Sequence, residues 1–209
     1  SAATTSADLD TLSPRIHEDV IRQVADADPR LDEDLAEWWD EDSPLPRLTL
    51  LGPVRACTRG KPMPDRKPYF TEVLAYLALR PHGATAEETA EAFNITTAKC
   101  RDYVGRCREW LGKNPRTGQP HLPHASKAPA AQTRGGNIYQ VVDVLVDADL
   151  FRRLRTRAEA RGGAEGIEDL RQALKLVQGP PFTQLRRGGW VWLASGDRVD
   201  QHMVCAIVD

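Results

Sequence analysis

Hydrophobic residues recur with helical spacing between Thr96 and Leu111, in the stretch TTAKCRDYVGRCREWL. Counted from the first of them, they fall at i, i+3, i+4, i+7, i+10 and i+11, which is the spacing of one face of an α-helix. They are Cys100, Tyr103, Val104, Cys107, Trp110 and Leu111. Many of the positions between them carry basic side chains, so the pattern predicts a helix with one buried face and one cationic face.

Two further helices are predicted immediately before this one. Residues 69–79 carry apolar side chains with helical spacing and end at a Pro-His-Gly sequence, which is the pattern of a core helix. Thr85 and Glu88 stand three residues apart and form a capping box, so a short helix is expected to begin there. Residues 94–95 supply a tight turn, and Thr96 caps the long basic helix.

Short strands are predicted on both sides of these helices. Residues 47–63 change to an alternating period with turn residues, which indicates two or three short antiparallel strands. Gly112 ends the long helix, and residues 113–132 form a loop rich in proline, glycine, serine and basic residues. Residues 133–139 predict a hairpin with Gly-Gly at its tip. A hairpin directly after the second helix of a helix-turn-helix unit is a wing.

The remainder of the chain is helical. The stretch DADLFRRLRTRAEARGG predicts a helix capped by Asp147 or Asp149, a second helix follows over residues 165–177, and another begins at residue 197. The apolar positions of the first two are Leu150, Phe151, Leu154 and Ala158, and Ile167, Leu170, Leu174 and Val177. Such a pair resembles a helical repeat, which needs neighbours to complete its core. Because the chain stops inside an apolar stretch, we expect an incomplete, TPR-like helical domain over residues 146–209.

Charge is distributed unevenly, although the formal net charge of the whole chain is only −2. Residues 1–46 carry 3 basic and 13 acidic side chains, residues 47–136 carry 15 and 7, and residues 137–209 carry 10 and 10. A basic block that contains the long helix indicates a phosphate-rich partner for that block.

The acidic lead, residues 1–46, has helical patterning over residues 12–24 and again over residues 31–39. The second piece carries Trp38 and Trp39 on its apolar side, so it is expected to dock through these rings. Two partners fit this pattern. One is the protein's own body, and the other is the basic block, which the carboxylates would cover as an internal competitor for phosphate.

Several functional classes lack support in the sequence. No run approaches the roughly 18 apolar residues of a membrane span, and the start SAATTSADLD is unlike a signal peptide. The four cysteines lack zinc spacing, which predicts reduced thiols in a cytoplasmic protein. His121 and His124 have no ligating partner nearby, and no catalytic or nucleotide-binding motif occurs. We therefore predict no enzymatic activity, cofactor, metal site or direct membrane contact.

A set of motifs carries a family resemblance over Arg47 to Trp192. In order, they are LTLLGPVRA, KPYFTEVLAYLAL, TAKCRDYVGRCREWLG, TRGGNIY, DADLFRRL and ALKLVQGPPF. In order and spacing the chain resembles the antibiotic-regulatory activator family, whose members join an OmpR-type winged helix-turn-helix to a helical bacterial transcriptional activator domain. The resemblance implies an α+β fold with a winged helix-turn-helix domain over residues 47–145, which begins with a small antiparallel sheet.

The resemblance also implies a DNA-binding transcriptional regulator. The helix at 96–111 would lie in the major groove, the wing at 133–139 on the backbone and minor groove, and the helical domain would mediate homodimerisation or contact another protein. Some relatives carry these domains as the cytoplasmic end of large membrane-anchored proteins, and the closing stretch GGWVWLASGDRVDQHMVCAIVD is most similar to that branch.

Specific residues follow from the major-groove interpretation. Arg101 is the best base reader, because its guanidinium can bond guanine with two hydrogen bonds, and Thr97 faces outward beside it. The expected phosphate contacts are Thr96, Lys99, Arg106, Arg108, Lys113, Arg116 and Arg134. Asp102 could accept from cytosine or form an ion pair with Arg101 or Arg106, and we favour the ion pair.

An alternative function uses the same fold without DNA. Asp102 and Gly105 occupy outward positions of the long helix, where an acid repels phosphate and glycine reads no base. The chain could therefore be a degenerate winged-helix module that mediates protein interaction or signalling within a larger membrane-anchored protein.

Overall fold

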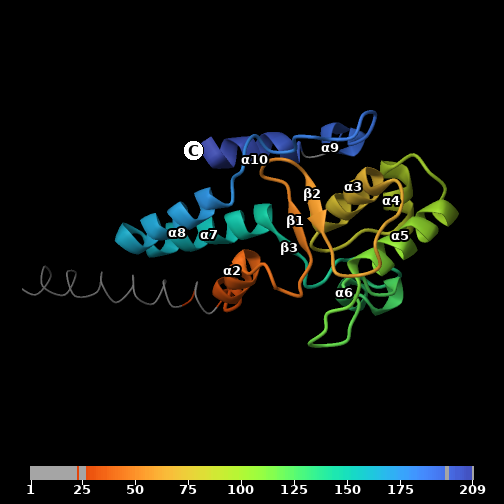
Figure 1. Ribbon diagram of the computed structural model, residues 1–209, viewed down its shortest axis with the longest axis horizontal. Helices are drawn as coiled ribbons and strands as arrows, with labels where there is room; N and C mark the ends of the chain where they lie inside the picture. The colour runs from red at the N-terminus through yellow and green to blue at the C-terminus, as the bar shows by residue number, and fades with distance from the viewer. Residues whose placement is uncertain (1–22, 24–26, 196–197, 209) are drawn as a thin grey trace, which may run out of the picture.

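The computed structural model describes Gln23 and residues 27–195 and 198–208 of the chain. In chain order its elements are α2 (Leu31–Trp39), β1 (Arg47–Thr49), β2 (Arg55–Cys57), α3 (Lys67–Ala78), α4 (Ala86–Ala92), α5 (Thr97–Leu111), the 3-10 helix η1 (Ala125–Lys127), α6 (Pro129–Arg134), β3 (Leu145–Val146), α7 (Asp147–Arg161), α8 (Gly163–Lys175), α9 (Val191–Ser195) and α10 (Val199–Val208) (Figure 1). The described chain is mixed α/β with one small sheet, which agrees with the α+β class. The helix expected over residues 12–24 lies outside the described residues apart from Gln23.

The sheet lies between two groups of helices (Figure 1). On one side are α2, α7 and α8, and on the other are α3 to α6. Strand β1 is central: Leu48 stands opposite Ala56 of β2 in an antiparallel pair and opposite Val146 of β3 in a parallel pair. The antiparallel pair confirms the strands expected within residues 47–63. The parallel third strand was not expected, because its direction depends on how the distant segment that leads into α7 docks.

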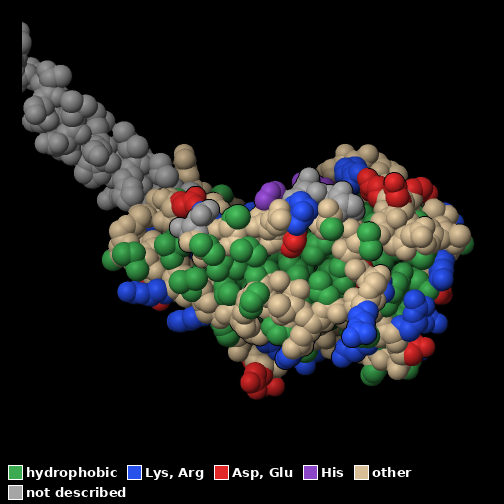
Figure 2. Space-filling view, turned by 90° about the horizontal axis from the view of Figure 1, so that it is seen from above, with side chains coloured by type: hydrophobic (Ala, Val, Ile, Leu, Met, Phe, Trp, Pro, Cys, Tyr) green, Lys and Arg blue, Asp and Glu red, His purple; other side chains and the backbone are tan. Residues whose placement is uncertain are grey.

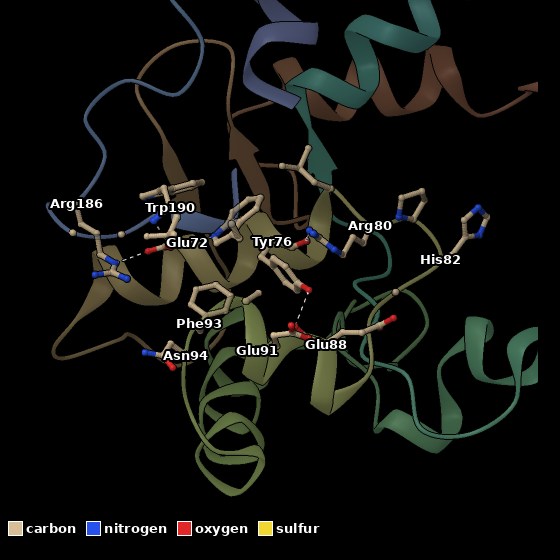
Figure 3. A pocket seen from close by; sticks show the side chains of 18 residues that line it. Glu72, Tyr76, Arg80, His82, Glu88, Glu91, Phe93, Asn94, Arg186 and Trp190 are labelled. Atoms are coloured by element: carbon tan, nitrogen blue, oxygen red, sulfur yellow. Dashed lines mark hydrogen bonds and ion pairs between the residues drawn. The ribbon is translucent and has the colours of Figure 1, made fainter. Parts of the chain in front are cut away.

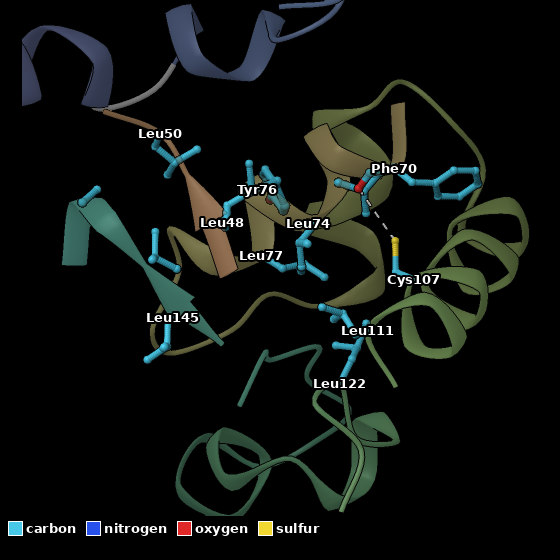
Figure 4. Close-up of a cluster of buried hydrophobic side chains, with 14 of the residues drawn as sticks. Leu48, Leu50, Phe70, Leu74, Tyr76, Leu77, Cys107, Leu111, Leu122 and Leu145 are labelled. Carbon is cyan, nitrogen blue, oxygen red and sulfur yellow. Dashed lines mark hydrogen bonds between the residues drawn. The ribbon is translucent and has the colours of Figure 1, made fainter. Parts of the chain in front are cut away.

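Helix α3 is the centre of the larger group, since every residue from Phe70 to Leu77 is buried. Figure 4 shows Leu74 and Leu77 of this helix between Leu48 of β1 and Leu111 of α5. A helix that is buried on several sides must find partners for any polar group that it carries.

Helix α5 forms as the hydrophobic pattern predicts. Its buried residues are Cys100, Tyr103, Val104, Cys107, Trp110 and Leu111. The Thr96 hydroxyl accepts a hydrogen bond from the backbone N–H of Lys99 at 3.3 Å, so the expected N-cap is present. The capping box at the start of α4 is also confirmed, since Thr85 and Glu88 exchange hydrogen bonds.

The prediction of a wing hairpin over residues 133–139 is wrong. The segment before the glycine pair forms the helix α6, which has Pro129 in its first turn and ends at Gly135 with a φ of 78°. After it, Ile138 donates from its backbone to the carbonyl of Ala125, and Tyr139 pairs with Ala84 in an isolated antiparallel bridge. Glycine is as common after a helix as in a hairpin turn, and local sequence does not distinguish the two.

The α7–α8 pair forms, but α8 presents an unexpected face to its neighbour. Helix α7 buries Leu150, Phe151, Leu154 and Ala158, as the pattern predicts. Helix α8 instead buries Gly166, Asp169 and Ala173, while Ile167, Leu170 and Leu174 are exposed. A Cβ on Gly166 would lie 2.6 Å from the carbonyl oxygen of Ala158, so the small residues allow close approach to α7. Figure 2 shows extensive hydrophobic surface on the face seen from above.

Because of this close approach, substitutions at two glycines are expected to change the free energy of unfolding in opposite directions. Gly166→Ala is expected to lower the free energy of unfolding by about 1–3 kcal/mol, since the added carbon meets the α7 backbone. Gly105→Ala is expected to raise it by about 0.5–1 kcal/mol, because alanine is the better helix former. Nothing lies within 4 Å of a Cβ placed at Gly105. Urea denaturation measures both, and an unchanged midpoint for Gly166→Ala would contradict the close packing.

The described part of the acidic lead docks on the helical group. Arg153 of α7 pairs with Asp28 at 2.7 Å and with Asp34 at 2.8 Å, and Arg157 pairs with Asp32 at 2.6 Å. Leu31, Leu35 and Trp38 on the same helix are buried. The protein's own body is therefore the partner of α2, as the first of the two interpretations has it. Among the described residues, no helix is long and apolar enough to cross a membrane.

Candidate nucleic-acid interface

Helices α4 and α5 are joined by a tight turn. Asn94 takes a left-handed conformation with a φ of 50°, and Ile95 donates from its backbone to the carbonyl of Ala90 at 2.9 Å. Asparagine tolerates this conformation better than most residues. Helix-turn-helix units also consist of two helices joined by a short turn, and in those that bind DNA the second helix enters the major groove.

The buried face of α5 is held by aromatic contacts. The ring of Tyr103 lies edge-on to Tyr69 and Phe70, with centroid distances of 5.3 and 5.4 Å. Arg66, in the loop before α3, donates a hydrogen bond to the Tyr103 hydroxyl at 2.7 Å. Burial raises the pKa of Cys107 to about 12, so this thiol is a neutral core group. The outer face of α5 is thus presented by a rigid helix.

The N-cap and the N-terminal half of α5 carry exposed cationic and hydroxyl groups. Thr96, Lys99 and Arg101 are exposed, and Thr97 is partly exposed. The Lys99 ammonium lies 5.6 Å from the centroid of the Tyr103 ring. Arg101 forms no hydrogen bond or ion pair with any residue that the structure describes. Its guanidinium is therefore available to a ligand.

Arg106 is engaged by carboxylates. Its guanidinium lies 3.7 Å from Asp102, one turn earlier on α5, and 3.9 Å from Asp65 in the loop before α3. The first contact confirms the predicted Asp102–Arg106 ion pair. Both carboxylates and the arginine are largely exposed, so these pairs reduce the local positive charge and contribute little to stability.

Two of the expected phosphate contacts instead hold the backbone of nearby loops. Arg108 donates to the carbonyl of Leu122 at 2.7 Å and to that of Pro123 at 3.3 Å. Arg134 donates to the carbonyls of His82 and Gly83 at 2.9 and 3.1 Å, and it lies 3.8 Å from Glu88. Because the wing hairpin does not form, Arg134 is the last residue of α6 rather than part of a wing.

The remaining two candidates lie beyond the end of α5. Arg116 forms an ion pair with Glu37 of α2, so the lead neutralises this one member of the basic block. A hydrogen bond from Ser43, then that from Arg116, lowers the pKa of Glu37. Lys113 is exposed, and its ammonium has no ion pair among the described residues. Of the predicted DNA contacts, Thr96, Thr97, Lys99 and Arg101 are thus together, and Lys113 lies at the opposite end of the helix.

A hollow of about 410 Å³ opens beside Arg101. His124 and Asn137, which are both exposed, line it together with residues of α4 and α5. In the sequence these two residues fall in the predicted long loop and wing, where no functional role is expected for them. No sequence signal would have identified them, since η1 and the Tyr139 bridge bring them to α5.

A larger cleft of about 1060 Å³ lies between α3, α4 and the segment 186–192 (Figure 3). Its wall is organised by Glu72, which accepts from the backbone N–H of Trp190 at 2.6 Å and from the Trp192 indole at 3.1 Å. Arg186 also pairs with this carboxylate. Arg80 stacks on Tyr76, with its guanidinium carbon 3.6 Å from the ring centroid. The Glu72 carboxylate thus ties the segment 186–192 to α3 along this wall of the cleft.

The two histidines of the HLPH stretch differ in environment. His121 is buried, its Nδ1 lies 3.0 Å from the carbonyl of Val142, and burial lowers its pKa. His124 is exposed beside the hollow near Arg101. No cluster of ligating side chains that could hold a metal ion occurs within the described ranges.

Comparison with known proteins assigns no family, since no family model and no curated protein matches the chain. The resemblance to the antibiotic-regulatory activators therefore remains a prediction from the motifs.

Proposed function

We propose that the chain binds double-stranded DNA through the N-terminal half of α5 and acts as a transcriptional regulator. The observation that supports this most directly is the unpaired Arg101 guanidinium on the outer face of the second helix of a helix-turn-helix pair. The helix has 15 residues, a length of about 22 Å, which is enough to lie along a major groove.

The exposed groups suggest a division of roles. Arg101 can bond a guanine edge with two parallel hydrogen bonds, while Lys99 and the Thr96 and Thr97 hydroxyls contact phosphates. His124 and Asn137, beside the hollow, are positioned to approach the adjacent strand. Because a single arginine reads bases, discrimination between sequences is limited to about 1–3 kcal/mol from that contact.

Binding to a labelled random-sequence duplex tests this proposal. On a random-sequence duplex Arg101, like Lys99, contacts phosphates rather than a base. The association constant is therefore expected to fall with salt between about 50 and 200 mM, with a slope of log K against log salt of about −2 for these two cations. Arg101→Ala should reduce the magnitude of this slope by about one. Fluorescence anisotropy at several salt concentrations measures both.

Two control variants sharpen the result. Arg116→Ala should leave the slope unchanged, because Glu37 already occupies this guanidinium. Arg171→Ala, on the remote helix α8, should have no effect either. If the folded wild-type chain does not bind the duplex at about 50 mM salt, the DNA-binding function is ruled out.

A second function is favoured by the acidic residues around α5. Asp102 and Asp65 both lie near Arg106, and Glu37 pairs with Arg116, so these two members of the basic block are neutralised within the chain. A helix-turn-helix unit of this kind can serve as a protein-interaction or signalling module. Absence of DNA binding together with an intact fold would support this alternative.

A further inference from the structure

A second cleft, of about 680 Å³, runs beside β2 at the edge of the sheet. The end of α2 and the start of α3 form two of its walls, and the segment 184–186 forms part of another. Strand β2 is an edge strand, because the order of the sheet is β2-β1-β3. An edge strand presents backbone donors and acceptors that can pair with another extended chain.

The protein itself pairs with the segment just before β2 and then leaves the edge open. Thr183 donates to the carbonyl of Gly52 at 3.0 Å, and Val54 donates back to the carbonyl of Thr183 at 3.0 Å. This strand-like pairing ends there, and the chain turns away at Gln184. Within the described part of the chain, the backbone of Arg55–Cys57 pairs only with β1. Backbone groups alternate in direction along a strand, and both those of Arg55 bond the Thr49 hydroxyl of β1. The N–H and C=O of Ala56 are therefore the edge groups that face the cleft without a second neighbour.

The charges around this edge are mainly positive. Arg55 and Lys67 are exposed and form no ion pair with any described residue. Arg47 donates to the carbonyls of Trp38 and Glu41 rather than to a carboxylate. Two acidic groups lie nearby. Glu41 lines the cleft, and Glu72 lies behind Arg186, with which it pairs. An occupant with negative charge would thus complement two free cations.

The cleft also offers an apolar contact. Trp39 is 54% exposed, whereas its neighbour Trp38 is buried and anchors the end of α2. Val54 and Ala56 line the cleft on the strand side. An exposed indole next to an open strand edge suits an apolar side chain of an added strand, with acidic side chains at neighbouring positions.

We propose that this cleft binds an extended acidic peptide segment of a partner protein, which adds to the sheet along β2. The backbone of the peptide pairs with that of Ala56, an apolar side chain packs on Trp39, and carboxylates contact the side chains of Arg55 and Lys67. The site is separate from the outer face of α5, so it stands or falls independently of DNA binding.

The probe is a blocked peptide of alternating glutamate and valine, titrated into the intact chain while tryptophan fluorescence and heat are recorded. The double variant Arg55→Glu, Lys67→Glu should bind about tenfold more weakly, because two attractions become repulsions. Arg171→Glu, a charge reversal on the exposed face of α8, is the matched control and should bind as the wild type does.

Changes to the peptide test strand addition without altering the protein. Methylating the backbone nitrogens at alternate positions, in one register or the other, keeps the charges but removes hydrogen-bond donors. Strand addition predicts that methylation in one register weakens peptide binding about tenfold and methylation in the other register weakens it much less. The reason is that only every second backbone N–H of the peptide faces β2. Equal binding of both methylated forms and the parent would overturn the proposal. So would equal binding of a lysine–valine peptide, or an absence of binding by the acidic peptide to the folded wild-type chain.

Discussion

Replacing Glu72 by glutamine is expected to lower the free energy of unfolding by about 3–5 kcal/mol, because a buried charge partner is removed. Glu72 is 1% exposed and accepts from Arg186, from the Trp190 backbone and from the Trp192 indole. The amide retains one acceptor oxygen, and its NH₂ group faces another donor. The Arg186 guanidinium, meanwhile, loses its counter-charge.

Denaturant titration of the variant measures this effect through its midpoint. Glu91→Gln is the matched control, since Glu91 is exposed on α4 at the other side of the same cleft, and its change should stay within about 0.5 kcal/mol. The loss should coincide with altered tryptophan fluorescence, because the segment 186–192 is held to α3 through this carboxylate. A stable variant with unchanged tryptophan emission would show that Glu72 does not anchor the segment.

Replacing Asp147 by asparagine is expected to lower the free energy of unfolding by about 3 kcal/mol, through lost hydrogen bonds to a buried carboxylate. The carboxylate accepts from the backbone N–H groups of Leu50, Leu51 and Ala148 at 2.7–3.0 Å. It ties the chain after β1 to the start of α7, and its exposed fraction is 0%. Asparagine places an NH₂ group against one of these donors.

The same carboxyl makes stability depend on pH. Burial raises the pKa of Asp147 from 3.8 to about 6, against the three backbone donors, which lower it. Between these values the folded chain holds a proton that the unfolded chain releases. The contribution of the protonated Asp147 carboxyl to folding stability is therefore fully present below pH 3.8 and is lost as the pH rises through about 6. The shift between these two pKa values corresponds to about 3 kcal/mol.

The difference between the wild type and Asp147→Asn should thus widen as the pH falls from about 7 to 4, because only the wild type gains this term. Unfolding curves of both proteins at several pH values give the difference directly. Asp42→Asn, at an exposed position in the loop after α2, is the control and should change stability by less than about 0.5 kcal/mol. A pH-independent difference would show that Asp147 titrates near its ordinary value.

Glu72 and Asp147 illustrate what sequence patterns do not reveal. In the sequence Glu72 is an ordinary acidic position within a predicted helix, and Asp147 is only a possible helix cap. Each has partners on segments far away in the chain, with Trp190 for Glu72 and Leu50 for Asp147. A hydrophobic period reports which face of a helix is buried, but it contains no information about which distant donor meets a buried carboxylate.

The predicted DNA contacts divide in the same way. The spacing that defines the buried face of α5 also determines which residues point outward, so the exposure of Lys99 and Arg101 could be predicted. The Asp102–Arg106 pair lies within one helix and was predicted for that reason. Arg108, Arg116 and Arg134 are engaged by groups on other segments, and the sequence could not assign those partners.

By itself, the sequence determined the local features: the helix over residues 97–111 and its buried face, the caps at Thr85 and Thr96, and the antiparallel strands within residues 47–63. These depend on contacts within a few residues, and local periodicity encodes them. Only the tertiary structure decided the parallel strand β3, the helix α6 in place of a wing, and the exposed apolar stripe of α8. Each depends on which distant surfaces pack together, because glycine, alanine and charged residues permit several local conformations and the packing selects one.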